Sequence, residues 1–319
     1  MKVVVVGGGS WGTAFSQVLA KREHDVTLAC RDAEQAAEIA RTGRNPRYLR
    51  HADLSGVAAT PLDEAPYDAA ELVVVAVPSA LFASVVAAIP GRAPILSLTK
   101  GLHPGTGQRL STLVEDRPVA VLSGPNIAEE IARDLPAAAV IASDDPQLSL
   151  DLQTAINSLT FRVYVNDDIV GVELCAAAKN VVALAAGGAD GLRLGDNAKA
   201  ALVARGLAEM GRLADAAGAR PETFAGLAGM GDLIVTCWSQ AGRNRRAGEL
   251  IAQGATPEAA VQEIGMVVEG LTTAPVVRDL SRRLGIELPI TEGVCAVLEG
   301  VPLADLVVQL MGRRPTFET

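Results

Sequence analysis

Residues 3–14 read VVVVGGGSWGTA, a β-branched run that leads through a glycine-rich turn into a helical segment. Within this stretch Gly7, Gly9 and Gly12 form the pattern GxGxxG. The first glycine permits a tight turn, the second lets the backbone approach a pyrophosphate, and the third lets helix and strand pack closely. The start of the helix then offers its N–H groups to phosphates. We interpret the stretch as a dinucleotide-binding turn, with a ligand-free glycine-rich turn as the alternative.

Short β-branched runs alternate with helical segments through the first half of the chain. Strand character marks residues 3–6, 26–29, 72–77, 95–98, 119–122, 138–141 and 161–165, and helical composition marks residues 33–41, 80–88 and 147–156. Buried strands that alternate with helices are typical of a Rossmann-type, doubly wound parallel sheet. Ligands of such sheets bind beyond the carboxyl ends of the strands, where the glycine-rich turn lies.

The pattern changes after residue 165. From residue 167 onward the segments are rich in Ala and Leu, have helical composition and are punctuated by Gly and Pro. We therefore predict an α/β fold with a Rossmann dinucleotide-binding domain at residues 1–167 and an all-helical substrate-binding and catalytic domain at residues 168–319. Because we find no flexible linker, we expect the two domains to pack directly and leave a cleft between them.

Composition and charge limit the classes of function. The 319-residue chain has a net charge of −9 and no long basic cluster, so we expect no nucleic-acid partner. We find no uninterrupted apolar stretch of the roughly 18 to 20 residues that a membrane span requires. The apolar run after Met1 ends at Gly7, too early for a secretory signal. The four cysteines are widely spaced and the histidines isolated, so we expect free thiols, no metal site and a cytoplasmic protein.

The end of the second predicted strand bears on the choice of cofactor. About 20 residues beyond the glycines, where a ribose is usually recognised, the sequence reads Cys30-Arg31-Asp32. Arg31 is suited to stack on adenine or to bind a 2′-phosphate, whereas Asp32 is suited to accept a ribose hydroxyl. The pattern permits NADP or NAD, with a slight preference for NADPH.

Lys179 is the most informative residue of the second half. It lies in a predicted helix over residues 172–188, and it is the only charged residue between Glu173 and Asp190. Its neighbours at helical spacing are small or apolar. Burial lowers the pKa of a lysine, which can then donate and accept a proton near neutral pH. A lysine that reaches the surface along its aliphatic stem is the alternative.

Two further segments favour the buried lysine. Asp232 lies in GMGDL at residues 229–233, where flanking glycines suit a carboxylate that holds or polarises a lysine. The segment GRNRR at residues 242–246 places Arg243 and Asn244 at a predicted helix start. Arginine forks onto phosphate oxygens and helix N–H groups add donors, so this segment predicts a site for a phosphorylated small molecule.

Further motifs run in order along nearly the whole chain. They are GGGSWGTA at 7–14, NPRYL at 45–49, LTKG at 98–101, SGPNIAEE at 123–130, AAAKNVVA at 176–183, GMGDLIVTC at 229–237, GRNRRAG at 242–248 and VVEG at 267–270. In this combination the sequence resembles the bacterial NAD(P)-dependent glycerol-3-phosphate dehydrogenases. The resemblance implies reversible reduction of dihydroxyacetone phosphate to sn-glycerol 3-phosphate, which supplies the backbone of phospholipids, and it implies a homodimer.

The resemblance also implies roles for individual residues. Lys179 would be the general acid and base at the C2 oxygen, positioned by Asp232, and Lys100 would contact substrate and cofactor. Arg243 and Asn244 would hold the substrate phosphate, and Gly124 would touch the substrate. The cofactor site would be lined by Gly7, Gly9, Ser10, Trp11, Gly12, Arg31, Lys100, Ala128, Arg243, Val267 and Glu269.

Two positions depart from the family pattern. Asn126 stands where the family often has serine, so it would contact the substrate through an amide. Gly242 stands where the family usually has serine, and it would contribute only a backbone N–H to the phosphate. We expect one phosphate contact to be weaker or to pass to Arg245 or Arg246, while the proton chemistry is unaffected.

Two other functions are compatible with parts of the pattern. A dehydrogenase of the same architecture that acts on a hydroxy acid or on ketopantoate would also place a lysine on the first helix of its second domain. The GMGD motif and the Gly-Arg-Asn segment favour a phosphate ester instead. A non-catalytic dinucleotide sensor would need the glycine-rich turn but no buried proton donor.

Overall fold

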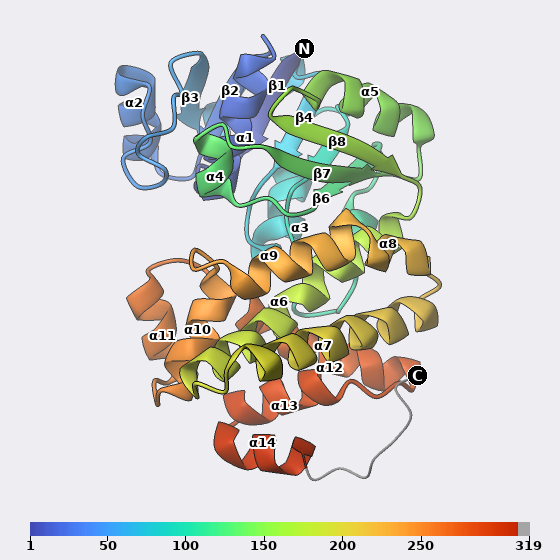
Figure 1. Ribbon diagram of the computed structural model, residues 1–319. Coiled ribbons are helices and arrows are strands. Elements are labelled where there is room, and N and C mark those ends of the chain that lie inside the picture. The colour runs from blue at the N-terminus through green and yellow to red at the C-terminus, as the bar shows by residue number, and fades with distance from the viewer. Residues whose placement is uncertain (312–319) are drawn as a thin grey trace.

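One eight-stranded sheet and a group of helices make up the protein (Figure 1). The computed structural model describes residues 1–311, so residues 312–319 of the predicted helical domain lie outside the described residues. The strands are β1 (Lys2–Val6), β2 (Asp25–Cys30), β3 (Val57–Pro61), β4 (Leu72–Val75), β5 (Ile95–Ser97), β6 (Val119–Ser123), β7 (Ala137–Ala142) and β8 (Phe161–Asn166). Their order in the sheet is β3-β2-β1-β4-β5-β6-β7-β8. From β1 to β3 the chain adds strands on one side of β1, and from β4 onward it adds them on the other side, which reverses the strand order between β1 and β4. This reversal confirms the predicted Rossmann-type fold.

The sheet departs from the predicted parallel arrangement at one pair, because β7 runs antiparallel to β6. Between these strands the chain forms only α4 (Ala128–Ala132), a five-residue helix. At about 1.5 Å per residue α4 covers less than half of a typical strand, which is roughly 17 to 20 Å long. The connection therefore does not carry the chain back across the sheet, and β7 starts near the edge where β6 ends.

The sequence pattern also missed β3, the edge strand beside β2. Its sequence is VAATP, and only Val57 of these residues is buried. Alanine and proline are rare in strands. Because an edge strand buries little side-chain surface here, its sequence carries only a weak signal.

Helices pack on both faces of the sheet. Val3 and Val5 of β1 face a core shared with α1, α2, α4 and α5, and Val4 and Val6 face a core shared with α3. The helices of this sheet half (residues 1–168) are α1 (Ser10–Lys21), α2 (Ala33–Thr42), α3 (Ser79–Ala88), α4 and α5 (Pro146–Ile156), with short turns η1 (Leu62–Glu64), η2 (Tyr67–Ala69) and η3 (Leu110–Leu113).

From Ile169 to Met311 the regular elements are all helical, as predicted, and we call this part the helical half. Its elements are α6 (Ile169–Gly191), α7 (Asp196–Ala216), α8 (Pro221–Ala225), η4 (Leu227–Gly231), α9 (Asp232–Trp238), α10 (Arg243–Ala252), α11 (Pro257–Ile264), α12 (Glu269–Leu284), α13 (Pro289–Leu298) and α14 (Leu303–Met311). The division predicted between residues 167 and 168 falls between β8 and α6, and it stays a prediction.

Helix α6 runs through the middle of the helical half (Figure 1). It begins at its N-cap Asp168, which accepts a hydrogen bond from the Gly171 N–H, and it continues to Gly191. The sequence pattern ended this helix at residue 188, because two glycines there resemble a helix stop. Among the described helices α6 alone is long and apolar enough to cross a membrane, but 89% of its apolar window is buried inside the protein. A helix that is apolar all round and buried is a core helix.

Candidate active site

The carboxyl ends of the parallel strands face the helical half. Ser79, at the start of α3, donates through Oγ to Glu269, at the start of α12, over 2.8 Å. Lys100, just after β5, and Ser123, at the end of β6, donate to Asp232 at the start of α9 over 2.8 and 3.4 Å. Polar side chains of both halves therefore meet at this edge of the sheet.

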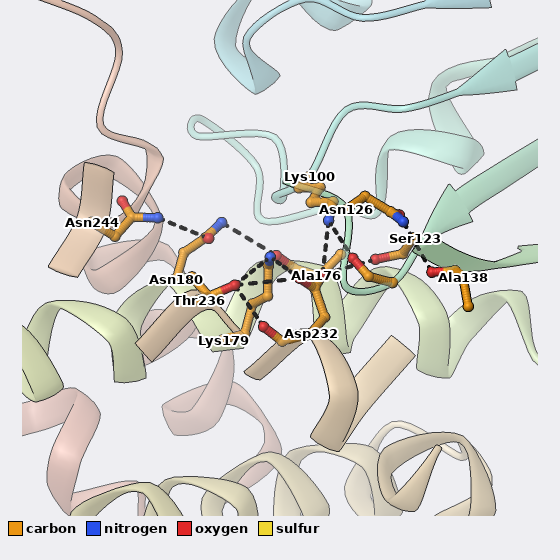
Figure 2. A network of polar contacts seen from close by, with 11 residues as sticks. Lys100, Ser123, Asn126, Ala138, Ala176, Lys179, Asn180, Asp232, Thr236 and Asn244 are labelled. Carbon is orange, nitrogen blue, oxygen red and sulfur yellow. Dashed lines mark hydrogen bonds and ion pairs between the residues drawn. The ribbon is translucent and has the colours of Figure 1, made fainter. Parts of the chain in front are cut away.

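A buried carboxylate between two lysines forms the centre of this junction (Figure 2). Asp232 is 1% exposed, and its Oδ1 accepts a hydrogen bond from Lys179 Nζ at 2.6 Å. Its Oδ2 accepts one from Lys100 Nζ at 2.8 Å. Lys179 is 5% exposed, which confirms the burial that its helix predicted. When both lysines are protonated the cluster is positively charged, which suits an anionic substrate.

Burial and mutual charge shift the acid–base properties of this cluster. Burial lowers the pKa of Lys179 to about 7, opposed by the Asp232 carboxylate and assisted by the charge of Lys100. Burial by itself would raise the pKa of Asp232, but the two lysines hold it below its usual range. Asp232 therefore stays ionised while Lys179 gains or loses a proton near neutral pH.

Two polar residues that the sequence analysis did not single out complete the surroundings of Lys179 (Figure 2). Thr236 Oγ1 accepts a hydrogen bond from Lys179 Nζ at 2.9 Å and donates to the Asp232 carbonyl at 2.6 Å. Asn180, next to Lys179, accepts a hydrogen bond from Asn244 Nδ2 at 2.9 Å. Both carried a signal, since Thr236 lies one helical turn after Asp232 and Asn180 is an amide in an otherwise apolar helix.

A π-helical turn aims Asp232 at the lysines. The turn η4 ends immediately before Asp232, and a Cβ at Gly229 would lie 2.1 Å from the Phe224 carbonyl oxygen. Only glycine permits this approach. Gly229 of the GMGD motif therefore allows tight packing on α8, and single π-helical turns are frequent at functional sites.

Asn244 joins the predicted phosphate segment to the lysine helix. It lies near the start of α10 and is 8% exposed. In addition to its bond to Asn180, its Oδ1 accepts a hydrogen bond from the Gly270 N–H at 2.8 Å. The chain of amides links α10 with α6 and α12 beside Lys179.

Arg243 and Gly242 precede Asn244 at the same helix start. Arg243 is exposed and donates through Nη1 to the Val267 carbonyl at 2.8 Å, next to the start of α12. A guanidinium group has five N–H donors, so this bond leaves others for a phosphate. The Gly242 N–H donates to the Ser239 carbonyl at 3.0 Å, so the turn already uses it.

The expectation that a phosphate contact passes to Arg245 or Arg246 stays a prediction, and both side chains already form ion pairs. Arg245 Nη1 pairs with Asp190 at 2.6 Å. Arg246 pairs with Glu249 at 3.1 Å and with Glu263 at 2.8 Å. Both guanidinium groups therefore neutralise carboxylates of the helical half.

The glycine-rich turn has the geometry that its sequence predicted. A Cβ at Gly12 would lie 2.0 Å from the Gly7 carbonyl oxygen, so only glycine fits where α1 leaves the turn. A Cβ at Gly9 would meet no atom of residues 1–311 within 4 Å, so the backbone is open to a ligand. Gly9 also gives α1 no side-chain cap, which leaves helix N–H groups for an anion. These features fit the pyrophosphate of a dinucleotide.

Asn45 braces this turn, a role that the sequence analysis missed. Its side chain is fully buried and donates through Nδ2 to the Gly8 carbonyl at 3.0 Å and to Thr13 Oγ1 at 2.8 Å. Ser10 and Trp11 follow the turn as the first residues of α1, and Trp11 packs against the core of the sheet half. The NPRYL motif thus holds the glycine-rich turn from outside.

The end of β2 gives different surroundings to Arg31 and Asp32. The Oδ1 of Asp32 caps α2 by accepting the N–H groups of Glu34 and Gln35 at 2.9 and 3.2 Å. Its Oδ2 pairs with Arg47 at 2.7 Å. Arg31 is exposed and lines a half-open cavity of about 790 Å³ beside η1, η2 and α3. The Asp32 carboxylate is therefore engaged by the start of α2 and by Arg47, whereas Arg31 faces the cavity.

The remaining predicted residues lie around the same edge. Gly124, whose φ of +139° favours glycine, accepts a hydrogen bond from Lys100 at its carbonyl. Asn126 donates through Nδ2 to the Ala138 carbonyl at 2.9 Å, and its buried Oδ1 has no partner within residues 1–311. Ala128 begins α4, and Val267 and Glu269 lie at the start of α12. Burial raises the pKa of Glu269, and its bonds to Ser79 oppose this shift.

Metal binding has no support in the described part of the chain, where no group of three or more His, Cys, Asp or Glu side chains could hold an ion. Cys30, Cys175, Cys237 and Cys295 are free and buried. Burial raises the pKa of Cys237, the cysteine closest in sequence to Asp232, to about 12. The Cys237 thiol therefore stays protonated at neutral pH.

Comparison with known proteins adds an independent assignment. Models of the N-terminus and the C-terminus of NAD-dependent glycerol-3-phosphate dehydrogenase match residues 2–149 and 168–308. The NAD(P)+ glycerol-3-phosphate dehydrogenase of Moorella thermoacetica is 45% identical, over 99% of this chain and 97% of its own. The chain belongs to the NAD-dependent glycerol-3-phosphate dehydrogenase family.

Other members of the glycerol-3-phosphate dehydrogenase family agree. The NAD(P)+ enzyme of Nocardia farcinica is 44% identical over 98% of both chains. The crystal structure of the Coxiella burnetii glycerol-3-phosphate dehydrogenase superposes with a TM-score of 0.93, at 38% identity, over 98% of this chain and 99% of that one. The resemblance drawn from the motifs is thereby confirmed, together with the class of enzyme, an NAD(P)-dependent oxidoreductase.

Proposed function

We propose that this protein reversibly reduces dihydroxyacetone phosphate to sn-glycerol 3-phosphate with NAD(P)H. The observation that carries the proposal is the buried cluster of Lys179, Asp232 and Lys100, which lies between the sheet edge and the Arg243–Asn244 segment. A proton donor, an open dinucleotide turn and cationic groups for a phosphate converge there, as reduction of a phosphorylated ketone requires.

Lys179 is the general acid and base in this proposal. When bound, the nicotinamide cofactor supplies or accepts the hydride at C2. Lys179 donates its proton to the C2 oxygen as negative charge develops there, and in the reverse direction it takes the proton from the C2 hydroxyl. Asp232 and Thr236 accept hydrogen bonds from its ammonium group and so fix the direction of that group.

The other groups orient the substrate. Lys100 adds positive charge beside the developing oxyanion, Gly124 touches the substrate, and Asn126 contacts it through its amide. Arg243 and Asn244 hold the phosphate, and the Gly242 N–H adds nothing to it because that group bonds the Ser239 carbonyl. Because the phosphate is remote from C2, its binding energy can align the ketone for hydride transfer.

The cofactor would occupy the glycine-rich turn and the surfaces around it. The residues assigned to it are Gly7, Gly9, Ser10, Trp11, Gly12, Arg31, Lys100, Ala128, Arg243, Val267 and Glu269. The contacts of Asp32 with α2 and Arg47 leave Arg31 as the residue that faces the cavity. This arrangement supports the slight preference for NADPH, since a guanidinium group binds a 2′-phosphate.

The test is the absorbance of the reduced nicotinamide band, with purified protein, dihydroxyacetone phosphate and either NADPH or NADH. We expect rapid loss of absorbance, and a rate ratio that favours NADPH. Folded protein that binds the cofactor but gives no loss with either one would contradict the proposal. Faster turnover of ketopantoate or a hydroxy acid would show that dihydroxyacetone phosphate is not the substrate.

We also propose that the protein acts in the cytoplasm, as a homodimer, and that its product serves phospholipid synthesis. The buried free thiols support a reducing compartment, and the family resemblance supports the dimer. Light scattering of the purified protein tests the dimer, and a monomeric mass at micromolar concentration would refute it.

A further inference from the structure

A second buried carboxylate lies on α6, away from the lysine cluster. Glu173 is 6% exposed and precedes Lys179 by six residues on the same helix. At 3.6 residues per turn these two side chains leave the helix in different directions. Glu173 faces the segment that follows Lys100, whereas Lys179 faces α9.

The Glu173 carboxylate accepts three hydrogen bonds from Arg109 and Ser111 of this segment. Its Oε1 accepts the Ser111 N–H at 2.8 Å, and its Oε2 accepts Ser111 Oγ at 2.5 Å and Arg109 Nη1 at 2.9 Å. Arg109 Nη1 also donates to Ser111 Oγ at 3.1 Å. A buried carboxylate with an arginine and two further donors is a fixed structure, because loss of any partner leaves a buried charge unsatisfied.

The same segment carries Lys100 at its other end. Leu102 and Arg109 form an isolated antiparallel bridge, and the His103 N–H donates to the Gln108 carbonyl at 2.9 Å. Leu102 is buried in the core of the helical half, whereas Leu110 belongs to a core of the sheet half. The bridge therefore couples the position of residues 109–111 to that of the backbone two residues after Lys100.

We propose that Glu173 is a positioning residue, which anchors residues 100–111 on α6 and so fixes Lys100 against Asp232 opposite Lys179. Helix α6 then holds both lysines, one directly and the other through Arg109 and Ser111. This inference rests on the proposed function, because it assigns a role in that reaction to a residue that contacts neither substrate nor cofactor.

The change Glu173→Gln tests whether Glu173 positions Lys100 or only stabilises the fold. A glutamine keeps the size and one acceptor, but its NH₂ group faces the Arg109 donor and the charge is lost, so residues 100–111 loosen. A displacement of about 1 Å at a reacting group can cost up to about a hundredfold. We expect kcat/KM for dihydroxyacetone phosphate to fall about tenfold to a hundredfold.

The pH profile is a second readout that loss of stability alone does not move. The titratable groups that act on Lys179 are Asp232 and Cys237 on α9, and Lys100. Cys175 lies one turn before it on α6. Of these, Lys100 lowers the pKa of Lys179. When Lys100 moves away, the pH above which ketone reduction declines should rise, by about one unit.

Glu209→Gln is the matched control. Glu209 is also a buried carboxylate, 4% exposed, but it joins α7 to the Thr291 N–H and hydroxyl, both at 3.2 Å, at the start of α13. We expect this variant to lower the melting temperature and leave the pH profile unchanged. Arg109→Lys, which restores a cation opposite Glu173, should recover most of the loss seen in Arg109→Ala.

The outcomes are distinct. Wild-type protein without NAD(P)H oxidation refutes the proposed function before any variant is compared. With an active wild type, a Glu173→Gln variant whose pH profile and kcat/KM match those of Glu209→Gln overturns the positioning role. If Glu173→Gln does not fold, Ser111→Ala is the second variant, because it removes the hydroxyl bonds to Glu173 and Arg109 and keeps the bond from the Ser111 N–H. It must show the same upward shift at smaller size, and an unchanged profile rejects the proposal.

Discussion

At the scale of single residues, the proton of Lys179 decides whether the site catalyses or only binds. The change Lys179→Ala removes the group that donates to Asp232 and Thr236, so we expect turnover to fall by about 10²- to 10⁴-fold, the usual contribution of general acid–base catalysis. NADPH binding, followed by nucleotide fluorescence, should persist. Lys21→Ala, which removes an exposed ion pair with Asp134, is the control and should keep full turnover. Unchanged turnover in Lys179→Ala would favour the dinucleotide sensor.

The pKa of Lys179, about 7, sets opposite pH dependences for the two directions. Ketone reduction needs the protonated amine, so its kcat/KM should be level below this pKa and fall about tenfold per unit above it. Alcohol oxidation needs the neutral amine, so its kcat/KM should rise up to this pKa and then level off. Initial rates in both directions test this above the second phosphate ionisation of the substrates, near pH 6. If kcat/KM for reduction and for oxidation changed with pH in the same direction, Lys179 could not be the proton donor of one reaction and the proton acceptor of the other.

At the scale of elements, glycines bring α6 and α10 into backbone contact. A Cβ at Gly187 would lie 1.8 Å from the Arg245 carbonyl oxygen, and one at Gly248 would lie 1.9 Å from that of Leu184. Because Asn244 begins the same helix α10, Gly248→Ala should separate the helices, destabilise the protein by about 1 to 3 kcal/mol and raise KM for dihydroxyacetone phosphate. Denaturant unfolding and initial rates measure both effects.

Gly211→Ala is the matched control for this prediction. Gly211 lies inside α7, and a Cβ there would meet no atom within 4 Å in the part of the chain that the structure describes. Alanine at such a position favours the helix by about 0.5 to 1 kcal/mol, so the same substitution should stabilise the protein and leave KM unchanged. A destabilised Gly211→Ala with an unaffected Gly248→Ala would contradict the packing argument.

The glycines of α6 also show which features of the fold the sequence does not predict. The periods of the apolar residues were enough to predict most strands and the central helix, because buried strands and helices carry strong local patterns. Gly187 and Gly188 resemble a helix stop in the sequence, yet they lie inside α6, where Gly187 packs against α10 and Gly188 against Leu303 of α14. The edge strand β3 and the reversal at β7 likewise depend on neighbours in space, which no local window contains.

At the scale of the whole molecule, the sequence predicts which residues belong to the site but not which of them contact one another. Burial of Lys179 followed from its own helix. Its partner Asp232 lies 53 residues away, and Lys100 lies 132 residues from Asp232, so only the packing of the two halves shows that one carboxylate holds both lysines. Asn45 stood out only as part of the NPRYL motif, because its partners Gly8 and Thr13 lie 37 and 32 residues away. The partners of Glu173, Arg109 and Ser111, lie 64 and 62 residues away.

The same packing predicts how the cofactor should stabilise the molecule. The residues assigned to NADPH lie on both halves, from the glycine-rich turn to Glu269 at the start of α12, where Glu269 already bonds Ser79. A ligand that binds only the folded chain adds about 2.7 kcal/mol at a hundredfold excess over its dissociation constant. We expect that increase in calorimetric melting of wild type and of Lys179→Ala alike, with one transition for both halves. A rise confined to one of two separate transitions would show that the cofactor contacts a single half, and Val267 and Glu269 would then lose their assignment.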